Sequence, residues 1–239
     1  MKIRQININT KNRKYPILIG SNLIKNLKNI LKNNSINSSK YLLVIDTKVP
    51  KKLVELTKKN LDTKAIIYRF VSSEKNKNFN KLNHILNILL KENFNRNDSI
   101  IAVGGGIVGD VAAFAASIFK RGLNLINIPT TLLAQVDSSI GGKTGINTEY
   151  GKNLIGSFYQ PKIVISDVSF LRSLPKRELI CGYGEILKHA LIKNRKLFNY
   201  LSKYLDKIIK LESPFIEKAI YDSCSIKKEV VQKDEEKKN

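Results

Sequence analysis

Short apolar segments alternate with amphipathic segments over the first two thirds of this chain, and this alternation limits the folds open to it. The amphipathic segments 22–31, 51–60 and 81–91 carry apolar residues at spacings of three and four, which predicts helices packed on a sheet. Alternating strands and helices predict a mostly parallel sheet covered on both faces. The strand-like apolar segments are bounded by polar residues, glycine or proline, and they cover residues 3–8, 15–19, 41–45, 65–70, 99–103, 123–128 and 163–165.

The remainder of the chain predicts mainly helix. Helical periodicity covers residues 176–192, 196–210 and 215–231, and Pro175 and Pro214 stand where two of these helices would begin. We therefore expect an α/β domain over residues 1–166 and a helical region over residues 167–239. The last segment, residues 233–239, is highly charged and has no apolar side chain, so we expect it to be frayed.

Length and composition narrow the class of protein. The chain has 239 residues, of which 42% are hydrophobic, and this is enough for a folded core. No apolar run approaches the roughly 18 residues of a membrane span, and the start lacks the apolar stretch of a signal peptide. Cys181 and Cys224 form neither a metal-type pair nor a disulfide framework. Together these features predict a cytoplasmic protein with no membrane partner.

The charge is strongly positive, with 42 Lys and Arg against 20 Asp and Glu and a formal net charge of +22. A basic surface can bind nucleic acid by releasing counterions. The lysines, however, are scattered among Asn and Ile along the whole chain, and no DNA-binding or RNA-binding motif accompanies them. We expect weak affinity for polyanions and no specific nucleic-acid partner. A basic nucleic-acid-binding module is kept as the alternative that is not an enzyme.

A glycine-rich turn is the sharpest local signal. It reads Gly104-Gly105-Gly106-Ile107-Val108-Gly109-Asp110, follows an apolar run and opens an Ala-rich helix expected over residues 111–119. Glycines let the backbone approach a pyrophosphate, and a helix N-terminus presents free N–H groups to it. A dinucleotide is therefore the leading ligand, and a turn that merely packs tightly is the alternative. The acidic residue that usually follows about 20 residues later is missing, and the nearest candidate is Asp46 after the strand 41–45.

The segment that follows, residues 129–153, is crowded with polar side chains. Gly141-Gly142-Lys143-Thr144 resembles the end of a P-loop, but Asp137 stands where that motif needs its first glycine, so a triphosphate cradle is not supported. We interpret the segment as a site for an anionic substrate, with an ordinary polar loop as the alternative. Its polar residues are Thr130, Thr131, Gln135, Asp137, Ser138, Ser139, Lys143, Asn147, Lys152 and Asn153.

One predicted helix carries three functional groups on a single face. Glu185, Lys188 and His189 stand at positions i, i+3 and i+4. Glu185 and His189 have the spacing of two metal ligands, and Lys188 could meet a substrate anion. Spacing alone favours an exposed face with ordinary helical pairs. The other histidine, His84, is expected on a helix surface, so no histidine-rich cluster completes a metal site.

Taken together, these segments resemble the 3-dehydroquinate synthases of the sugar-phosphate cyclase group, which are related in fold to iron-type alcohol and glycerol dehydrogenases. The resemblance covers nearly the whole chain, and its long central block is highly specific. It rests on residues 73–77, 104–110, 119–122, 129–147, 151–156, 159–161, 174–179 and 184–188. It implies an α/β protein with a Rossmann-like, parallel-sheet NAD-binding domain followed by an incomplete α-helical domain.

The resemblance also implies a reaction. It is the conversion of 3-deoxy-arabino-heptulosonate 7-phosphate, a small sugar-phosphate substrate, to 3-dehydroquinate and phosphate, with catalytic NAD and a divalent metal, zinc or cobalt. Full-length members are expected to be homodimers. The alternatives are a sister cyclase and an NAD enzyme like glycerol dehydrogenase. The family's second and third metal ligands are histidines beyond the position of Asn239, so we expect either a fragment or a truncated, inactive enzyme with exposed apolar helix surface.

Individual roles carry over from the family by position. The first metal ligand falls on Glu185, whereas His189 falls at a variable position and is not a ligand. Ser73 replaces a usual glycine, so the turn before Lys77 is expected to be less tight. Substrate-binding and catalytic roles fall on Arg121, Asp137, Lys143, Lys152, Asn153 and Lys188. NAD-binding roles fall on Asp46, Ser72, Ser73, Glu74, Lys75, Asn76, Lys77, Gly106, Ile107, Val108, Gly109, Asp110, Thr130, Thr131, Lys143, Lys152, Phe170, Leu171, Arg172 and Ser173.

Overall fold

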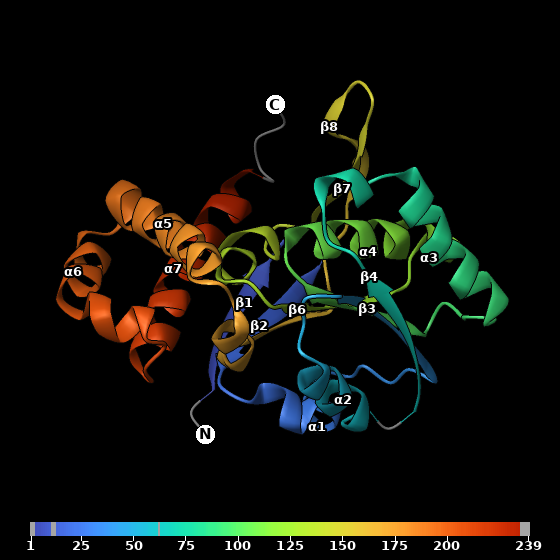
Figure 1. Cartoon of the computed structure of the whole chain (residues 1–239), viewed down its shortest axis with the longest axis horizontal. Coiled ribbons are helices and arrows are strands. Elements are labelled where there is room, and N and C mark those ends of the chain that lie inside the picture. The colour runs from blue at the N-terminus through green and yellow to red at the C-terminus, as the bar shows by residue number, and fades with distance from the viewer. Residues whose placement is uncertain (1–2, 11–12, 62, 235–239) are drawn as a thin grey trace.

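A computed structural model describes residues 3–10, 13–61 and 63–234, and a seven-stranded sheet lies at its centre (Figure 1). The strand order is β1-β2-β9-β6-β5-β3-β4. β1 pairs with β2 in antiparallel fashion and the other neighbouring strands are parallel, which confirms the predicted sheet. The strands are β1 (Arg4–Asn9), β2 (Lys14–Gly20), β3 (Lys40–Asp46), β4 (Lys64–Phe70), β5 (Ser99–Gly104), β6 (Asn124–Pro129) and β9 (Ile163–Asp167).

Helices cover both faces of the sheet. α1 (Leu27–Asn33) and α2 (Lys51–Lys59) lie on one face, and α3 (Phe79–Lys91) and α4 (Gly106–Ile118) lie on the other (Figure 1). Successive side chains of a strand point to opposite faces. Accordingly Leu43 of β3 is buried with the α1 and α2 side chains, and its neighbour Leu42 is buried with those of α3 and α4.

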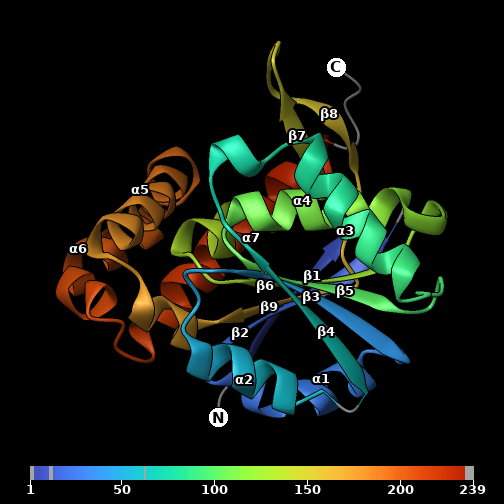
Figure 2. The same ribbon diagram turned by 45° about the vertical axis from the view of Figure 1, so that its right-hand side comes forward.

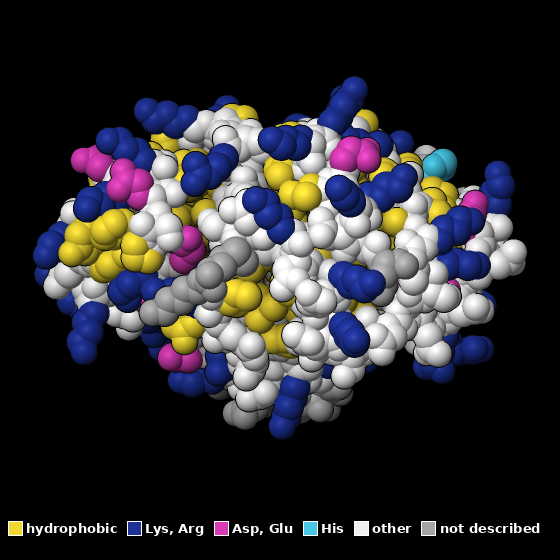
Figure 3. Space-filling model, turned by 90° about the horizontal axis from the view of Figure 1, so that it is seen from below, with side chains coloured by type: hydrophobic (Ala, Val, Ile, Leu, Met, Phe, Trp, Pro, Cys, Tyr) yellow, Lys and Arg dark blue, Asp and Glu magenta, His cyan; other side chains and the backbone are white. Residues whose placement is uncertain are grey.

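The C-terminal helices α5 (Lys176–Lys193), α6 (Arg195–Ile209) and α7 (Phe215–Asp234) gather at one end of the molecule (Figure 2). They share a third apolar cluster with β1 and β2, in which Ile8 and Tyr15 pack with Ile216 and Ile220 of α7. Within the described part of the chain, no helix combines the length and apolar character needed to cross a membrane. Lysine and arginine side chains are spread over the face seen in Figure 3 and form no single band.

The structure contains one antiparallel hairpin that the sequence did not predict. β7 (Lys143–Thr148) and β8 (Gly151–Phe158) lie in the segment interpreted as polar and irregular, and they project from the body of the molecule (Figure 1). Most side chains of β8 are exposed. A strand without a buried face shows no alternation of apolar and polar residues, so the periodicity contains no signal for it.

Three boundaries also differ from expectation. α4 begins at Gly106, five residues before the expected start at residue 111. The sequence does not indicate this earlier start, because the first turn of the helix contains residues with poor intrinsic helix propensity. The segment expected to be one helix over residues 22–31 begins as a 3₁₀ turn, η1 (Leu23–Asn26). Lys233 lies inside α7, so the expectation of a frayed end is wrong there, and residues 235–239 lie outside the described residues.

Candidate functional site

The site is built at the edge of the sheet where the parallel strands end. The connection from β3 leads to β4 on one side, and the connection from β5 leads to β6 on the other, so the strand order reverses between β3 and β5. Open α/β sheets bind ligands in the crevice at such a reversal. Asp46 ends β3 and Gly104 ends β5, and the other predicted NAD-binding segments follow β4, β6 and β9 at the same edge.

The glycine turn leaves little room for a side chain at Gly105 and Gly106. Gly105 caps α4 and Gly106 is its first residue. A Cβ on Gly105 would lie 3.2 Å from the Thr131 Cγ2 atom, and a Cβ on Gly106 would lie 3.0 Å from the Ser138 Oγ atom. Because the first N–H groups of a helix have no partner within it, the turn presents donors and a partial positive charge in a bare cradle. These features fit a pyrophosphate.

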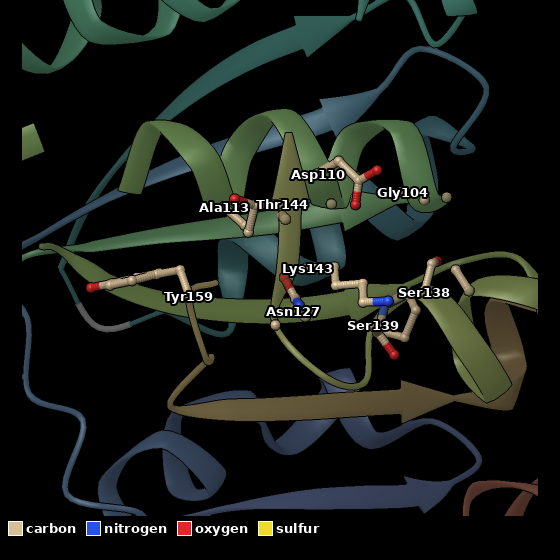
Figure 4. Close-up of a pocket in the computed structure, with 16 residues that line it drawn as sticks. Gly104, Asp110, Ala113, Asn127, Ser138, Ser139, Lys143, Thr144 and Tyr159 are labelled. Carbon is tan, nitrogen blue, oxygen red and sulfur yellow. The ribbon is translucent and has the colours of Figure 1, made fainter. Parts of the chain in front are cut away.

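A narrow cleft separates this turn from the polar segment that follows β6 (Figure 4). Asp110 on α4 and Lys143 on β7 stand on its two walls, and Ser138 and Ser139 line one end. Asn127 Oδ1 and Ser139 Oγ are buried and, within the described residues, have no hydrogen-bond partner. Since buried polar atoms are costly when unpaired, these two atoms suit a bound polar group.

Lys77 joins the glycine-turn helix to the hairpin. Its ammonium group is buried and lies 2.5 Å from both Asp110 Oδ2 and Asn153 Oδ1. Burial raises the pKa of Asp110, although the Lys77 ammonium acts in the opposite direction. The short turn η2 (Glu74–Asn76) is also tied to the hairpin, because Asn147 Nδ2 donates to Glu74 Oε2 at 2.8 Å.

Two exposed side chains complete this side of the site. Lys152 lies with its Nζ atom 3.7 Å from Glu74 Oε2, and Lys143 is exposed at the start of β7. Asn153 adopts a left-handed backbone conformation, with φ of 58°, in the turn that presents its amide to Lys77. The structure thus brings together five of the predicted residues, from η2 and the residue that follows it, from α4 and from the hairpin: Glu74, Lys77, Asp110, Lys152 and Asn153.

A second group of functional side chains lies between α5, α7 and the turn η4 (Ala134–Ser138). One ligand-type atom each of Asp137, Glu185 and His189 lies within 4.8 Å of the others. The side chains of Glu185 and His189 are 15% and 8% exposed. The expectation of an exposed helical face is therefore wrong for these two residues, because α5 packs against α7 and η4. Lys188 remains exposed and pairs with Glu185.

His189 is held at both ring nitrogens. Its Nε2 atom lies 3.2 Å from Glu185 Oε1, and its Nδ1 atom lies 2.7 Å from Ser223 Oγ on α7. Burial lowers the pKa of His189, while the Glu185 carboxylate opposes the change, and the lowered pKa favours the neutral imidazole. A neutral imidazole and two carboxylates form a donor set that fits zinc or cobalt.

Lys227 is a functional candidate that the sequence analysis missed. Its Nζ atom lies 2.5 Å from Asp137 Oδ1, with its side chain 25% exposed. The pair joins α7 to η4, 90 positions apart in sequence. Among so many lysines, nothing local distinguishes Lys227, and only the packing of α7 on η4 identifies it.

Other predicted residues lie apart from these groups. Arg121 ends the turn η3 (Phe119–Arg121), which follows the C-terminus of α4. A helix of 13 residues such as α4 is about 20 Å long. Arg121 therefore lies at the opposite edge of the sheet, and one copy of the chain does not bring it to the cleft.

The segment after β9 includes two predicted NAD-binding residues whose side chains are buried. Phe170 and Leu171 of η5 (Val168–Ser173) are buried in two different apolar clusters, so only their backbone can face a ligand. His84 lies exposed on α3 against Tyr68, as expected.

The fold and the site define the class: an α/β protein with a nucleotide-binding type of parallel sheet and a helical region beside it. The N-terminal model of 3-dehydroquinate synthase matches residues 67–181, and the C-terminal model matches residues 182–239. The chain belongs to the 3-dehydroquinate synthase family.

Two curated relatives illustrate the similarity. The 3-dehydroquinate synthase of Pelagibacter ubique is 59% identical over 236 residues, and that of Bartonella quintana is 41% identical over 244 residues. Each match covers 98% of this chain and 64% of the relative. The chain therefore spans slightly less than two thirds of the length of these relatives.

Solved structures of related cyclases share the fold. A 2-deoxy-scyllo-inosose synthase complexed with carbaglucose-6-phosphate, NAD⁺ and Co²⁺ matches with a TM-score of 0.85 and 28% identity, covering 99% of this chain and 64% of the other. A 2-epi-5-epi-valiolone synthase from Streptomyces hygroscopicus with NAD⁺ and Zn²⁺ bound matches with a TM-score of 0.84 and 26% identity, covering 95% and 63%. An iron-containing alcohol dehydrogenase, at 16% identity and a TM-score of 0.68, shares the fold alone.

Proposed function

We propose that this chain forms the NAD-binding part, and part of the metal and substrate site, of a 3-dehydroquinate synthase. The reaction converts 3-deoxy-arabino-heptulosonate 7-phosphate to 3-dehydroquinate and phosphate. The observation that carries this proposal is the cleft in which the bare glycine turn of α4 faces Lys143 and the Ser138–Ser139 pair. Family membership and the relatives' NAD-bound and metal-bound structures support it.

The residues of the cleft take distinct roles in this proposal. The N–H groups of the α4 turn hold the pyrophosphate, and Asp46 faces the adenosine end from the neighbouring strand. Lys143 and Lys152 provide positive charge for the substrate's carboxylate and phosphate groups. Lys77 keeps Asn153 and Asp110 in place between the two ligands.

The metal group would lie next to the substrate. Glu185 would bind a divalent metal, and Lys188 and Lys227 would hold substrate anions beside it. When bound, NAD supplies reversible hydride transfer and the metal supplies Lewis-acid polarisation of a hydroxyl group. The chain's own part is to bind, orient and surround the sugar phosphate with fixed charges.

As part of this proposal, we expect a domain division after residue 166, a homodimer and a cytoplasmic location. If a second copy brings its own Arg121 to this cleft, the position of that residue at the opposite edge is explained. Sedimentation of the purified chain tests the dimer.

Isothermal titration with NAD tests the proposal first. We expect saturable binding by the chain, and at least tenfold weaker binding by Gly106→Val, whose side chain would fill the cradle beside Ser138. Gly184→Val on α5 is the matched control, because a Cβ there meets nothing within 4 Å. No saturable binding to the unmodified chain would contradict the proposal.

Phosphate release from the heptulosonate phosphate tests the reaction in a second experiment. It requires NAD and Zn²⁺, with the longer Pelagibacter ubique relative as positive control. Phosphate release without net NADH formation supports the synthase, whereas net NADH formation with a polyol supports a dehydrogenase. Equal affinity for heparin and random DNA, unaffected by NAD, would instead support the nucleic-acid-binding alternative.

A further inference from the structure

The lysine that stands opposite the glycine turn in the cleft follows two consecutive glycines. Gly141 and Gly142 have positive φ angles of 105° and 69°, and they lie between η4 and the start of β7 at Lys143. Because glycine has the greatest backbone freedom of any residue, two glycines cannot by themselves fix the direction of the next side chain. Lys143 therefore depends on contacts from other segments to keep its place on the wall of the cleft (Figure 4).

We propose that Gln160 is a positioning residue for Lys143, because its buried carboxamide holds the Gly141–Gly142 turn in the conformation that directs Lys143 to the cleft. This inference rests on the proposed function, in which Lys143 provides positive charge for anionic ligands. Gln160 lies outside the described lining of the cleft, so its effect on a ligand passes through the turn.

The Gln160 side chain, in a residue that is 7% exposed, packs directly on the turn. Its Nε2 atom donates to the Gly141 carbonyl oxygen at 3.1 Å. The Gly141 N–H group donates to the Tyr15 hydroxyl at 3.3 Å, so Gln160 makes the shorter of these two bonds to the glycine. A Cβ on Gly142 would lie 2.6 Å from Gln160 Cδ. The carboxamide thus occupies the space beside Gly142 while it holds Gly141.

The backbone around Gln160 is itself anchored. The Tyr159 N–H group donates to the Gly142 carbonyl oxygen at 2.7 Å. Arg13 Nη1 donates to the Gln160 carbonyl oxygen at 2.9 Å, and its guanidinium lies over the Tyr159 ring. These contacts fix the position from which the Gln160 side chain reaches the turn. A side chain with a fixed base can hold a flexible segment, whereas a mobile one cannot.

An amide at this position has an energetic cost. Gln160 Oε1 is buried and has no hydrogen-bond partner among the residues that the structure describes. A methionine of similar size would avoid this unpaired acceptor, so packing alone gives no reason for an amide. The bond to Gly141 is the described contact of the side chain that requires the amide, and it therefore points to a positioning role.

Backbone ¹⁵N relaxation tests the positioning without any ligand. In the unmodified chain, the amides of residues 141–143 should be as rigid as those of β5. In Gln160→Met, which keeps the size of the side chain and removes the donor, the order parameters of residues 141–143 should fall while those of β5 stay the same. Gln5→Met is the matched control, because Gln5 is exposed on β1. Residues 141–143 that stay rigid in Gln160→Met would overturn the proposal.

The unmodified chain gives a second test that does not depend on the folding of a variant. The side-chain amide protons of Gln160 should exchange with solvent much more slowly than those of exposed Gln5, because Gln160 is buried and bonded to Gly141. Equally fast exchange in the two side chains, or mobile residues 141–143 in the unmodified chain, would overturn the proposal.

A double-mutant cycle tests whether the effect passes through Lys143. Titration with the heptulosonate phosphate, in the presence of saturating NAD, measures the affinity. Gln160→Met should weaken binding several-fold and Lys143→Met about tenfold, and the double variant should bind no more weakly than Lys143→Met alone. Gln5→Met should bind normally. Losses that add in the double variant would show that Gln160 acts by another route, and would overturn the proposal.

The outcomes also separate this proposal from the proposed function. Failure of the unmodified chain to bind NAD and the sugar phosphate contradicts the proposed function, and the relaxation measurement then decides the role of Gln160. Normal binding of both ligands, together with rigid residues 141–143 in Gln160→Met, contradicts the positioning role alone.

Discussion

Asp110 experiences two opposed electrostatic effects. Its carboxylate accepts a hydrogen bond from the buried Lys77 ammonium, yet the burial of this carboxylate on α4 has the larger effect on its pKa. A carboxyl group with a raised pKa in the folded chain binds its proton more tightly there than in the unfolded chain. Its contribution to stability is therefore fully present below the ordinary pKa and is lost as the pH rises through the raised value.

This sign gives a residue-scale prediction. Asp110→Asn replaces the titrating carboxyl group by an amide that does not titrate. The unmodified chain should therefore lose stability relative to this variant as the pH rises from about 3 to about 7, measured as the difference between their free energies of unfolding. Urea unfolding at a series of pH values measures the difference. A difference that is constant or rises with pH would show that Lys77, and not burial, controls the pKa of Asp110.

Two glycines on α5 differ in their surroundings although they are two positions apart. A Cβ on Gly182 would lie 2.5 Å from Leu132 Cβ and 2.6 Å from the Leu133 nitrogen. A Cβ on Gly184 would meet nothing within 4 Å. Gly182 is thus the point where the backbone of α5 approaches the segment that leads into η4, and this contact positions Glu185 near Asp137.

Replacing each of these two glycines of α5 by alanine should change the free energy of unfolding in different ways. Gly182→Ala should lower the free energy of unfolding by about 1–3 kcal/mol through overpacking. Gly184→Ala should leave it unchanged or raise it by up to about 1 kcal/mol, because alanine favours the helix. Chemical denaturation of the two variants measures both. Equal effects would mean that α5 does not pack closely on residues 132–133.

The hairpin β7–β8 packs on the body of the molecule through Ile146 of β7, which lies in the apolar cluster of α3 and α4, whereas most of β8 is exposed and is tied down by polar contacts. Lys77→Met removes the contact to Asn153, so the amides of residues 143–158 should exchange hydrogen several-fold faster while those of β5 and β6 stay protected. Lys64→Met, which breaks the 2.9 Å pair with Glu92 far from the hairpin, is the control. Unchanged exchange in the hairpin of Lys77→Met would show that Lys77 is not its anchor.

The elements differ in how far the sequence could predict them. The strands of the main sheet are continuous apolar runs because helices bury both faces, and that signal is strong. β8 lacks a buried face and β7 buries only Gly145 and Ile146, so periodicity gave no signal for the hairpin. The i, i+4 spacing of Glu185 and His189 identified the pair, but spacing does not show which face of a helix is buried. The partners Asp137, Ser223 and Lys227 come from other elements, and only packing brings them together.

For the whole molecule, the order of the strands explains how distant segments share a site. The reversal between β3 and β5 leaves a crevice at the carboxyl edge, and five of the strands deliver a predicted NAD-binding segment there. The same geometry separates Arg121, since α4 leads away from that edge. Sequence motifs and the family resemblance give the candidate site residues, while the arrangement of the strands determines which of them meet in one copy.

Hydrogen exchange with and without NAD tests the central claim most directly, because it reports on every part of the cleft in one experiment. We expect NAD to slow exchange both at residues 104–110 and at the facing residues 130–131 and 143–153, with no change on the α1 and α2 face. Binding of NAD without protection of the glycine turn, or with protection of only one of the two walls, would contradict this claim.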